Sequence, residues 1–578
     1  MHRSMRFATL MRETLQPNEA AMQERDLARM EATPFDVLII GGGITGAAVA
    51  WDATLRGLSV GLVEKDDFGH GTSAATSKLI HGGLRYLKQM EFDLVRESLR
   101  ERRIMQTITP HLVYPLPFLV PAYGWGLSGP PGLLGAAALY NALSYDRNRV
   151  PYSDQAMPAA RLRSPSQTLQ IAPQVNPDGL TGGLHYADCQ LYDSGRHVLA
   201  FLQSAAARGA QVANHAEVTD LVLESDRIRG AVVRDHLTDA SFTLNAEATI
   251  NVTGPWADFV LNLLAGETPP EHVRRSKGIH ILTPSIGPDD TALALQTPEG
   301  RHLFILPWRG HSLIGTTDVP FEGHPDESLV RERDIRDLLA TLNATYPPAD
   351  LTLDDVQHAY GGLRPIVDEQ TEVDTYTASR KYEIYDHTEE DIDGLFTVIG
   401  GKYTTSRALA ESLVDRLADP LDRDTESCTT DSTPLDSAPD EAFSSFCAKM
   451  QRRFSELPPT TVEHLARCYG AALPEVLMQS RWIPNGTQPI TERRPDLMLQ
   501  VDHAVEHEMA RRLTDVLHRR TGLGGLGPLP DSALERVAGR MGTLLDWSPT
   551  QRLRELDHAR ASFALPAASP SLDESSQS

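Results

Sequence analysis

The chain contains little cysteine, and the spacing of its cysteines excludes several classes of protein. Its 578 residues include four cysteines, at positions 189, 428, 447 and 468. Zinc and iron–sulfur sites use closely spaced pairs such as CxxC, and secreted disulfide scaffolds use a dense set of cysteines. Neither pattern is present, so we expect no metal centre and no disulfide framework. The sequence is typical of a protein that folds in a reducing cytoplasm.

The chain also lacks long hydrophobic runs, so no segment is expected to cross a membrane. Crossing a bilayer takes roughly 20 uninterrupted apolar residues. The nearest candidate, residues 123–145, is apolar and aromatic but is broken by six glycines and prolines, which leave one clear helix at Leu133–Leu143. This helix is expected either to pack in a core or to form a monotopic patch that lies in one leaflet. Residues 1–33 lack the apolar core of a secretory signal and are predicted to be a dispensable tail.

Excess positive charge is missing as well. The formal net charge is −24 and the sequence pI is about 5.3. Nucleic-acid binding requires a positive surface that displaces counterions from phosphates, so no nucleic-acid partner is expected. The length is too great for one compact core, which predicts two or three domains.

A glycine-rich segment near the start of the chain predicts a dinucleotide site. Phe35–Ile40 is an apolar run of strand length, and it leads directly into Gly41, Gly43 and Gly46 in the pattern GxGxxG. The first glycine allows a tight turn, the second lets the backbone approach a pyrophosphate, and the third lets the next helix pack against the strand. The helix N-terminus then points its amides at the phosphates.

The residues that follow support this prediction. A helix is expected from Thr45 to Arg56, with Gly57 as its C-cap, and a second buried strand from Ser59 to Val63. Glu64 comes roughly 20 residues after the glycines, where an acid binds a ribose hydroxyl. An acid at this position disfavours a 2′-phosphate.

The next segment carries the most specific pattern, Gly71-Thr-Ser-Ala-Ala-Thr-Ser-Lys-Leu-Ile-His-Gly-Gly-Leu-Arg-Tyr-Leu. Together with the fingerprint, it closely resembles the FAD-dependent glycerol-3-phosphate dehydrogenases, a branch of the D-amino-acid-oxidase-like flavoproteins. Further segments also resemble this family: residues 186–196, 248–256, 360–365 and 396–407. The resemblance extends over almost the whole chain, from Asp36 to about His558, with Val252 where alanine is usual.

The fingerprint and the resemblance together imply a FAD site. The small hydroxyl residues of this segment donate hydrogen bonds with little bulk, which suits a diphosphate and a ribityl chain. The expected cofactor-binding residues are Gly41, Gly43, Ile44, Thr45, Gly46, Glu64, Lys65, Thr72, Ser73, Ser77, Lys78, Leu79, His81, Gly82, Gly83, Val218, Gly254, Trp256, Gly400, Gly401, Lys402 and Thr404.

The resemblance also implies a substrate site for a phosphate ester. Arg85, Tyr86, Arg364 and Lys402 are expected to bind the substrate, and Arg364 and Lys402 are counted among the catalytic residues. Guanidinium groups suit this role because they offer a planar fork of donors to phosphate oxygens. His280 is the expected base for the alcohol proton. His81 and a water assisted by an arginine are the alternatives.

The chain is therefore predicted to be α/β, with a Rossmann-like FAD domain interleaved with an antiparallel-sheet substrate domain over residues 34–419. Strands are expected at Gly278–Leu282, Leu303–Trp308 and Leu313–Asp318, within a substrate sheet at about 265–375, and one strand at Gln211–Leu223. A linker over 420–440 precedes an all-helical domain over 441–560, which includes one long helix from Val501 to Thr521. Residues 561–578 are predicted to be a disordered tail.

The expected function is oxidation of sn-glycerol 3-phosphate to dihydroxyacetone phosphate by hydride transfer to FAD. The resemblance implies a quinone acceptor, and hence a cytoplasmic protein held peripherally at the inner face of the cell membrane, with a homodimer as a further expectation. Two alternatives remain: a glycerol-3-phosphate oxidase that uses oxygen, and a protein whose FAD is structural and whose helical domain binds a partner.

Overall fold

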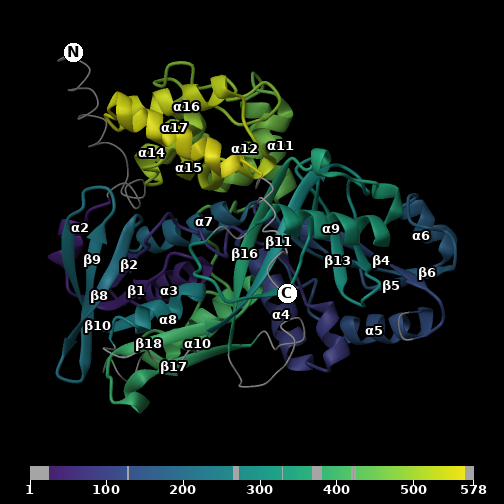
Figure 1. Cartoon of the computed structure of the whole chain (residues 1–578), viewed down its shortest axis with the longest axis horizontal. Helices are drawn as coiled ribbons and strands as arrows, with labels where there is room; N and C mark the ends of the chain where they lie inside the picture. Colours follow the sequence, from purple (N-terminus) through teal and green to yellow (C-terminus); the bar gives the residue numbers. More distant parts are fainter. Residues whose placement is uncertain are drawn as a thin grey trace, which may run out of the picture.

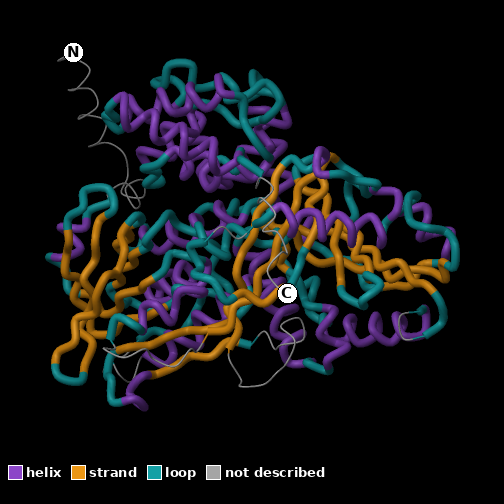
Figure 2. The backbone as a smooth tube through the Cα atoms, viewed as in Figure 1, coloured by secondary structure: helices purple, strands orange, loops and turns teal. Residues whose placement is uncertain are grey.

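The computed structural model describes residues 25–126, 129–264, 273–327, 330–367, 381–417, 421, 423 and 425–565. Two sheets stand side by side, and a helical domain lies above them (Figures 1 and 2). The predicted fold class is confirmed: a Rossmann-like sheet, a largely antiparallel sheet and a C-terminal helical unit are all present. Among the described residues, no helix is long and apolar enough to span a bilayer.

The first sheet holds the glycine fingerprint. Its parallel strands lie in the order β18 (Leu395–Gly400), β10 (Ser241–Asn251), β1 (Phe35–Ile40), β2 (Val60–Val63) and β7 (Gln211–Ala213). Every residue of β1 is buried, as expected for a parallel strand that is covered on both faces. Antiparallel strands extend the sheet at β17 (Tyr382–Asp386), β8 (Ala216–Glu224) and β9 (Arg227–Asp235).

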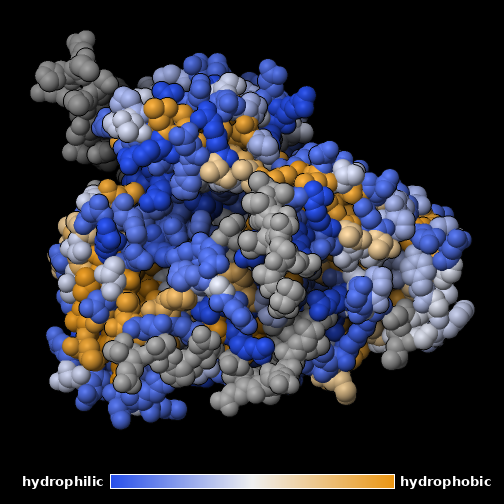
Figure 3. Space-filling view, viewed as in Figure 1, coloured by the Kyte–Doolittle hydropathy of each residue, from blue (hydrophilic) through white to orange (hydrophobic). Residues whose placement is uncertain are grey.

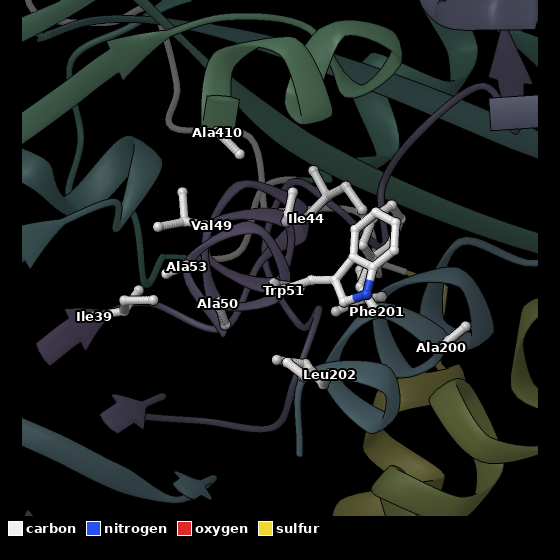
Figure 4. Close-up of a cluster of buried hydrophobic side chains, with 14 of the residues drawn as sticks. Ile39, Ile44, Val49, Ala50, Trp51, Ala53, Ala200, Phe201, Leu202 and Ala410 are labelled. Carbon is white, nitrogen blue, oxygen red and sulfur yellow. The ribbon is translucent and has the colours of Figure 1, made fainter. Parts of the chain in front are cut away.

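The helix that follows the fingerprint is the centre of the first core. Helix α3 (Ile44–Leu55) packs against α7 (Ser194–Ala206) and α10 (Ser406–Leu417). Trp51 of α3 meets Phe201 of α7 edge to face, with ring centroids 5.4 Å apart (Figure 4). Helices from three distant parts of the sequence therefore fix the position of one glycine turn.

The second sheet is assembled from both halves of the chain. Its strands lie in the order β15 (Val319–Phe321), β11 (Val273–Pro284), β14 (His311–Gly315), β13 (His302–Trp308), β12 (Ala292–Gln296), β4 (Val113–Tyr123), β6 (Leu180–Leu191) and β3 (Leu79–Ile80), while β16 (His358–Val367) pairs with β11 and β5 (Arg161–Arg163) with β6. The sheet is thus not confined to the predicted range 265–375, because strands from residues 79–191 complete it.

Helices cover the two faces of this sheet. One face packs on α9 (Glu332–Thr345), and the other packs on α4 (Phe92–Ile108) and α5 (Pro130–Leu143). The other described helical segments between residues 25 and 405 are short: α2 (Leu27–Glu31), η2 (Leu84–Gln89), η3 (Ser153–Gln155), α6 (Pro165–Ile171), η4 (Gly254–Trp256), α8 (Ala257–Leu261), η5 (Pro347–Ala349), η6 (Leu353–Asp355), η7 (His387–Glu390) and η8 (Tyr403–Thr405).

Two single elements predicted from the sequence are each broken in two. Gln211–Leu223 bends at His215, which has φ 51°, so that β7 stays in the parallel sheet and β8 leaves to pair with β9. The long helix predicted from Val501 to Thr521 ends at His507, and Met509 has φ 54°. This break places the buried Glu508 carboxylate 2.5 Å from Arg196 of α7. In both cases a contact outside the segment overrides its local periodicity.

The helical domain contains α11 (Phe443–Arg453), α12 (Pro459–Tyr469), η9 (Gly470–Ala472), α13 (Leu473–Gln479), α14 (Leu499–His507), α15 (Leu513–Asp515), the π-helix η10 (Val516–Arg520), η11 (Gly524–Leu526), α16 (Asp531–Leu544) and α17 (Pro549–Phe563). Charged side chains join it to the FAD domain. The buried Asp67 accepts hydrogen bonds from Arg519 and Arg520, and Asp515 lies 2.9 Å from Nε2 of His215. Because the two arginines balance these carboxylates, the cluster is an interdomain ion network.

Two segments predicted as tail or linker carry packed residues. Leu27 and Met30 are buried, and Arg25 forms an ion pair of 2.6 Å with Asp235, so part of the predicted tail belongs to the first domain. Thr430 and Leu435, from the predicted linker, are also buried. Residues 1–24 and 566–578 lie outside the described residues.

Candidate active site

A cavity of about 670 Å³ lies between the two sheets, and both contribute to its wall. Most of the predicted cofactor residues line it. Arg85, Tyr86, His280 and Arg364, which were predicted for substrate and catalysis, line the same cavity. Four predicted cofactor residues do not line it: Gly46, Lys78, Gly82 and Thr404.

The glycine turn forms one end of the cavity. Gly41 has φ 114°, a conformation that residues with a Cβ rarely adopt, and a Cβ on Gly46 would lie 1.9 Å from the carbonyl oxygen of Gly41. The amide of Ile44, the first residue of α3, donates to Ser73 Oγ at 2.9 Å. The turn leaves the backbone open to a close approach, and this geometry fits the pyrophosphate of a dinucleotide.

Glu64 stands at the end of β2, where the ribose acid was predicted. Its carboxylate accepts hydrogen bonds from the amides of Gly42 at 2.7 Å and Asp66 at 2.9 Å. Burial raises the pKa of Glu64 to about 7, because desolvation outweighs these hydrogen bonds. The position of the carboxylate suits a hydrogen bond to a ribose hydroxyl.

The wall beyond Glu64 joins the two sheets. Lys65 Nζ lies 2.5 Å from Asp326 and 4.6 Å from the centre of the Trp256 ring. Trp256 Nε1 also donates to Asp326 at 2.8 Å. Val218 and Gly254 also line the cavity. The contacts of Lys65, Trp256 and Asp326 connect the two domains beside the part of the cavity that is expected to hold the nucleotide.

In another part of the cavity wall, two cationic side chains contact one tyrosine. The Arg85 guanidinium lies 4.7 Å from the centre of the Tyr86 ring and donates to its hydroxyl at 3.0 Å. Lys402 Nζ lies 4.2 Å from the same ring centre and donates to Ser98 Oγ at 3.1 Å. Lys402 directly precedes η8 and α10, so the N-terminal end of that helix also faces the cavity. The arrangement concentrates positive charge where an anion can bind.

Arg364 reaches the cavity from strand β16. Its Nη2 donates to Thr316 Oγ1 at 2.7 Å, and its Nη1 lies 3.6 Å from the carboxylate of Asp318. Gly278 on the paired strand leaves room for this guanidinium, because a Cβ there would lie 2.2 Å from Nη2. The sheet therefore holds the guanidinium in one place.

His280 lies beside Arg364, on strand β11. Its Nε2 is hydrogen bonded to Ser77 Oγ at 2.8 Å, and its ring stacks on Tyr360 with centroids 5.2 Å apart. Burial, Arg364 and Lys78 together lower the pKa of His280 to about 3. The imidazole is therefore neutral near pH 7 and can accept a proton.

Lys78 has a different position from the one predicted. Its Nζ points away from the cavity and donates to Ala74 O at 2.8 Å and Ser194 Oγ at 2.7 Å. It also lies 5.6 Å from the centre of the Tyr360 ring, on which His280 stacks. The residue has φ 53°, and this turns its side chain into the protein. We conclude that Lys78 supports the wall behind His280.

The remaining predicted residues shape the loop around His81. Burial lowers the pKa of His81 to about 4, so this imidazole is neutral as well. The His81 amide donates to Thr404 Oγ1 at 3.2 Å, and the Gly82 amide donates to Asp188 Oδ1 at 3.0 Å. Thr404 and Gly82 therefore act on the cavity through the backbone of this loop.

Sequence reasoning missed four residues of the site. Thr316 and Asp318 hold Arg364, Tyr360 stacks on His280, and Asp188 anchors Gly82 while it pairs with the buried Arg102. Tyr360 and Asp188 are in segments that carry the family resemblance, so they could have been assigned from it. Asp318 is the last residue of a predicted strand, but only the fold brings it to Arg364.

Comparison with known proteins agrees with this geometry. Residues 36–416 match the family model of the FAD dependent oxidoreductases, and residues 428–552 match the C-terminal domain of alpha-glycerophosphate oxidase. The chain is 35% identical to a glycerol-3-phosphate dehydrogenase of Synechocystis over 91% of this chain and 96% of the relative. It is 30% identical to an alpha-glycerophosphate oxidase of Streptococcus pneumoniae over 92% of this chain and 95% of that one.

A solved structure shows the same fold. The crystal structure of the glycerol-3-phosphate dehydrogenase from Bacillus halodurans, complexed with FAD, superposes with a TM-score of 0.75 and 27% sequence identity. The match covers 95% of this chain and 98% of that one.

Proposed function

The chain belongs to the family of FAD-dependent glycerol-3-phosphate dehydrogenases, and from this premise we propose that it oxidises sn-glycerol 3-phosphate at C2 to dihydroxyacetone phosphate. When bound, FAD accepts the hydrogen and the two electrons that leave C2. One observation carries the proposal: a single cavity that fits a dinucleotide is lined by the basic side chains of Arg85, Arg364 and Lys402 and by His280.

The cationic residues are proposed to bind the phosphate. Arg85 and Lys402 contact the same tyrosine, and Arg364 is held by the sheet. An amino-acid oxidase would need a clamp for a carboxylate, whereas this set offers charge for a phosphate dianion. With the phosphate fixed, the C2 hydroxyl is held in one orientation, and positioning of this kind contributes much of the rate enhancement.

His280 is proposed as the base. The imidazole of His280, which the hydrogen bond between Nε2 and Ser77 orients, accepts the C2 hydroxyl proton, and burial together with Arg364 favours the neutral form of the ring before reaction. His81 is also neutral, but it lies on the loop near Arg85 and Lys402, where the phosphate is proposed to bind. The stack on Tyr360 and the bond to Ser77 give His280 the more defined orientation.

We propose a quinone as the electron acceptor and a peripheral attachment to the inner face of the cell membrane, because several full-length relatives are named dehydrogenases. Oxygen is the second candidate, since the C-terminal residues match the domain named for alpha-glycerophosphate oxidase. Rapid reduction of a quinone analogue with little peroxide supports the first acceptor, and rapid peroxide formation supports the second.

Turnover with an artificial dye acceptor tests the chemistry separately from the acceptor. We expect the purified FAD-loaded protein to form dihydroxyacetone phosphate from sn-glycerol 3-phosphate, and the variant Arg364→Met to lose at least a hundredfold in kcat/KM. Arg234→Met is the matched control, because Arg234 is a surface arginine paired with Asp239. Equal losses in both variants, or no product from the wild type, would contradict the proposal.

A further inference from the structure

A long part of this chain carries no charge. Charged residues make up 23% of the sequence, yet residues 104–145, a stretch of 42, include no Asp, Glu, Lys or Arg. The stretch forms the end of α4, strand β4 and helix α5. A buried location would account for such a composition, so the exposure of each part decides what it means.

Helix α5 meets only part of the expectation of a core helix: it packs on the second sheet, but most of its residues are not buried. Of its 14 residues, only Ala137 and Tyr140 are buried. Its exposed positions are Pro131, Leu134, Gly135, Ala138 and Ala142, and the side chain of Leu134 is 59% exposed. A helix on the surface of a soluble protein normally presents charged residues to water. This one presents only apolar and small side chains.

Aromatic residues stand at both ends of the helix. Trp125 precedes it and is 75% exposed, and Tyr145 follows it and is 64% exposed. Tryptophan and tyrosine favour the boundary between lipid and water, because one end of each ring is apolar and the other is polar. The helix lies along one edge of the molecule, beneath β4, β5 and β6 (Figure 1).

Basic residues follow the uncharged stretch, although the whole chain has a net charge of −24. Arg147 and Arg149 come directly after α5, and Arg161 and Arg163 lie in β5, which packs beside the helix. Of the two acids in this stretch, Asp146 is buried against Arg96 at 2.8 Å, and the exposed Asp154 leaves the four arginines in excess. The surroundings of the helix therefore complement an anionic surface.

The same helix forms part of the cavity wall. Leu133 and Ala136 line the cavity together with Phe118 and Val120 of β4, while Leu134 faces outward. One helix thus separates the cavity from the apolar exterior.

We propose that helix α5, with Trp125 and Tyr145 at its ends, lies in the headgroup layer of an anionic phospholipid bilayer. This surface is called the α5 face below. The inference rests on the membrane attachment proposed above and goes beyond it, because it names the surface and the lipid charge. Docked in this way, the protein holds the apolar wall of its cavity against the lipid, from which an apolar electron acceptor can be supplied.

Vesicle binding tests the α5 face. The full-length FAD-loaded protein is sedimented with vesicles of phosphatidylcholine and phosphatidylglycerol, and separately with vesicles of phosphatidylcholine alone. We expect binding to the anionic vesicles, weaker binding to the neutral ones, and at least tenfold weaker binding for the double variant Trp125→Ser, Leu134→Ser.

The chain offers a matched control in residues of similar exposure elsewhere. Trp482 of the helical domain is 78% exposed, and Leu223 of β8 is 49% exposed. Leu223 belongs to the β8–β10 end of the molecule, where Figure 3 shows apolar surface as well. The double variant Trp482→Ser, Leu223→Ser should bind vesicles as the wild type does. Flavin reduction by glycerol 3-phosphate should be unchanged in both variants, because none of the four residues lines the cavity.

Three results would overturn the proposal: no vesicle binding by the wild type, equal losses in the two double variants, or a change in oligomeric state of the α5-face variant without lipid. The last result would make the α5 face a contact with a second copy of the chain. A wild type that binds vesicles through this face without reducing its flavin would contradict the proposed substrate and leave the lipid surface standing.

Discussion

The hydroxyl of Ser77 lies 2.8 Å from Nε2 of His280, and this hydrogen bond joins two residues that are 203 positions apart in the sequence. Ser77 belongs to the loop that precedes β3, and His280 belongs to β11. The contact connects the segment that follows the FAD fingerprint to the substrate sheet. It therefore fixes the orientation of the proposed base relative to the cofactor site.

Removing this hydroxyl should slow the reaction, because the proposed base loses the contact that orients it. A typical hydrogen bond contributes about 1 kcal/mol, so we expect Ser77→Ala to lower kcat by about fivefold to tenfold with little change in KM. Stopped-flow reduction of the flavin measures the step directly. Ser204→Ala is the control, because Ser204 is a buried serine of α7 that bonds to Ala200 and Asp436 and lies away from the cavity. An unchanged rate of flavin reduction in Ser77→Ala would show that Ser77 does not orient His280 for the reaction.

The pH profile should lack an acid limb near the ordinary pKa of histidine. The pKa of His280 is lowered to about 3 by burial and by the positive charges of Arg364 and Lys78, while Ser77 and Tyr360 face it as neutral groups. A base with a lowered pKa stays unprotonated as pH falls from 8 to 5, so kcat at saturating substrate should stay flat over this range. The ratio kcat/KM also reports the second pKa of the substrate phosphate, which is about 6. Lys78→Met removes one positive charge and should move the acid limb upward. An acid limb near pH 6.5 in the wild-type kcat would contradict this assignment.

A single methyl group at Gly278 should displace Arg364 without removing its charge. A Cβ at Gly278 would lie 2.2 Å from Arg364 Nη2, so Gly278→Ala must displace the guanidinium. We expect a loss in kcat/KM of about 1–3 kcal/mol, which is roughly fivefold to 150-fold. Gly539→Ala is the matched control, because the nearest atom to its Cβ lies 3.5 Å away, in the flexible side chain of Arg552. Wild-type kinetics in Gly278→Ala would show that Arg364 is not held as the structure indicates.

The interdomain ion network should contribute strongly to stability. Asp67 is fully buried and accepts from Arg520 at 2.6 and 2.8 Å, so Asp67→Asn leaves buried guanidinium charge without its carboxylate. We expect a loss of about 3–5 kcal/mol in the free energy of unfolding. Because the pKa of Asp67 is lowered in the folded state, this stabilisation is present at neutral pH and is lost only as the pH falls through that pKa.

Urea unfolding at pH 7 measures this effect. Asp239→Asn serves as the control, because the Asp239 side chain is 79% exposed and its pair with Arg234 should contribute less than about 1 kcal/mol. Similar losses of unfolding free energy in the two variants would show that the network stabilises the fold no more than an exposed ion pair does.

Local patterns predicted the parts of this fold that local interactions decide. The strand before the glycines, the glycine turn and α3 follow from residues within one short segment, and the antiparallel strands follow from alternation. The break at Met509 could not be predicted, because the helix stops so that Glu508 can reach Arg196, a residue 312 positions away. The orientation of the Lys78 side chain could not be predicted from local sequence either. The residue has a positive φ, and its Nζ donates to Ser194, which lies 116 positions away.

In the site as well, the main residues could be predicted from the sequence, whereas their partners could not. The residue types of the FAD turn follow from its chemistry, and the family resemblance named Arg85, His280, Arg364 and Lys402, all of which line one cavity. The partners of these residues come from paired strands and neighbouring loops. Thr316, Asp318 and Tyr360 enter the site only when β11, β14 and β16 are placed together.

Anaerobic mixing of the FAD-loaded protein with sn-glycerol 3-phosphate tests the central claim most directly. The absorbance of oxidised flavin should disappear with this substrate and persist with glycerol, which lacks the phosphate that Arg85, Arg364 and Lys402 are proposed to bind. Added dihydroxyacetone phosphate should restore part of the absorbance, because the reaction is then driven backward. A flavin that stays oxidised with sn-glycerol 3-phosphate, or is bleached equally by glycerol, would contradict the account.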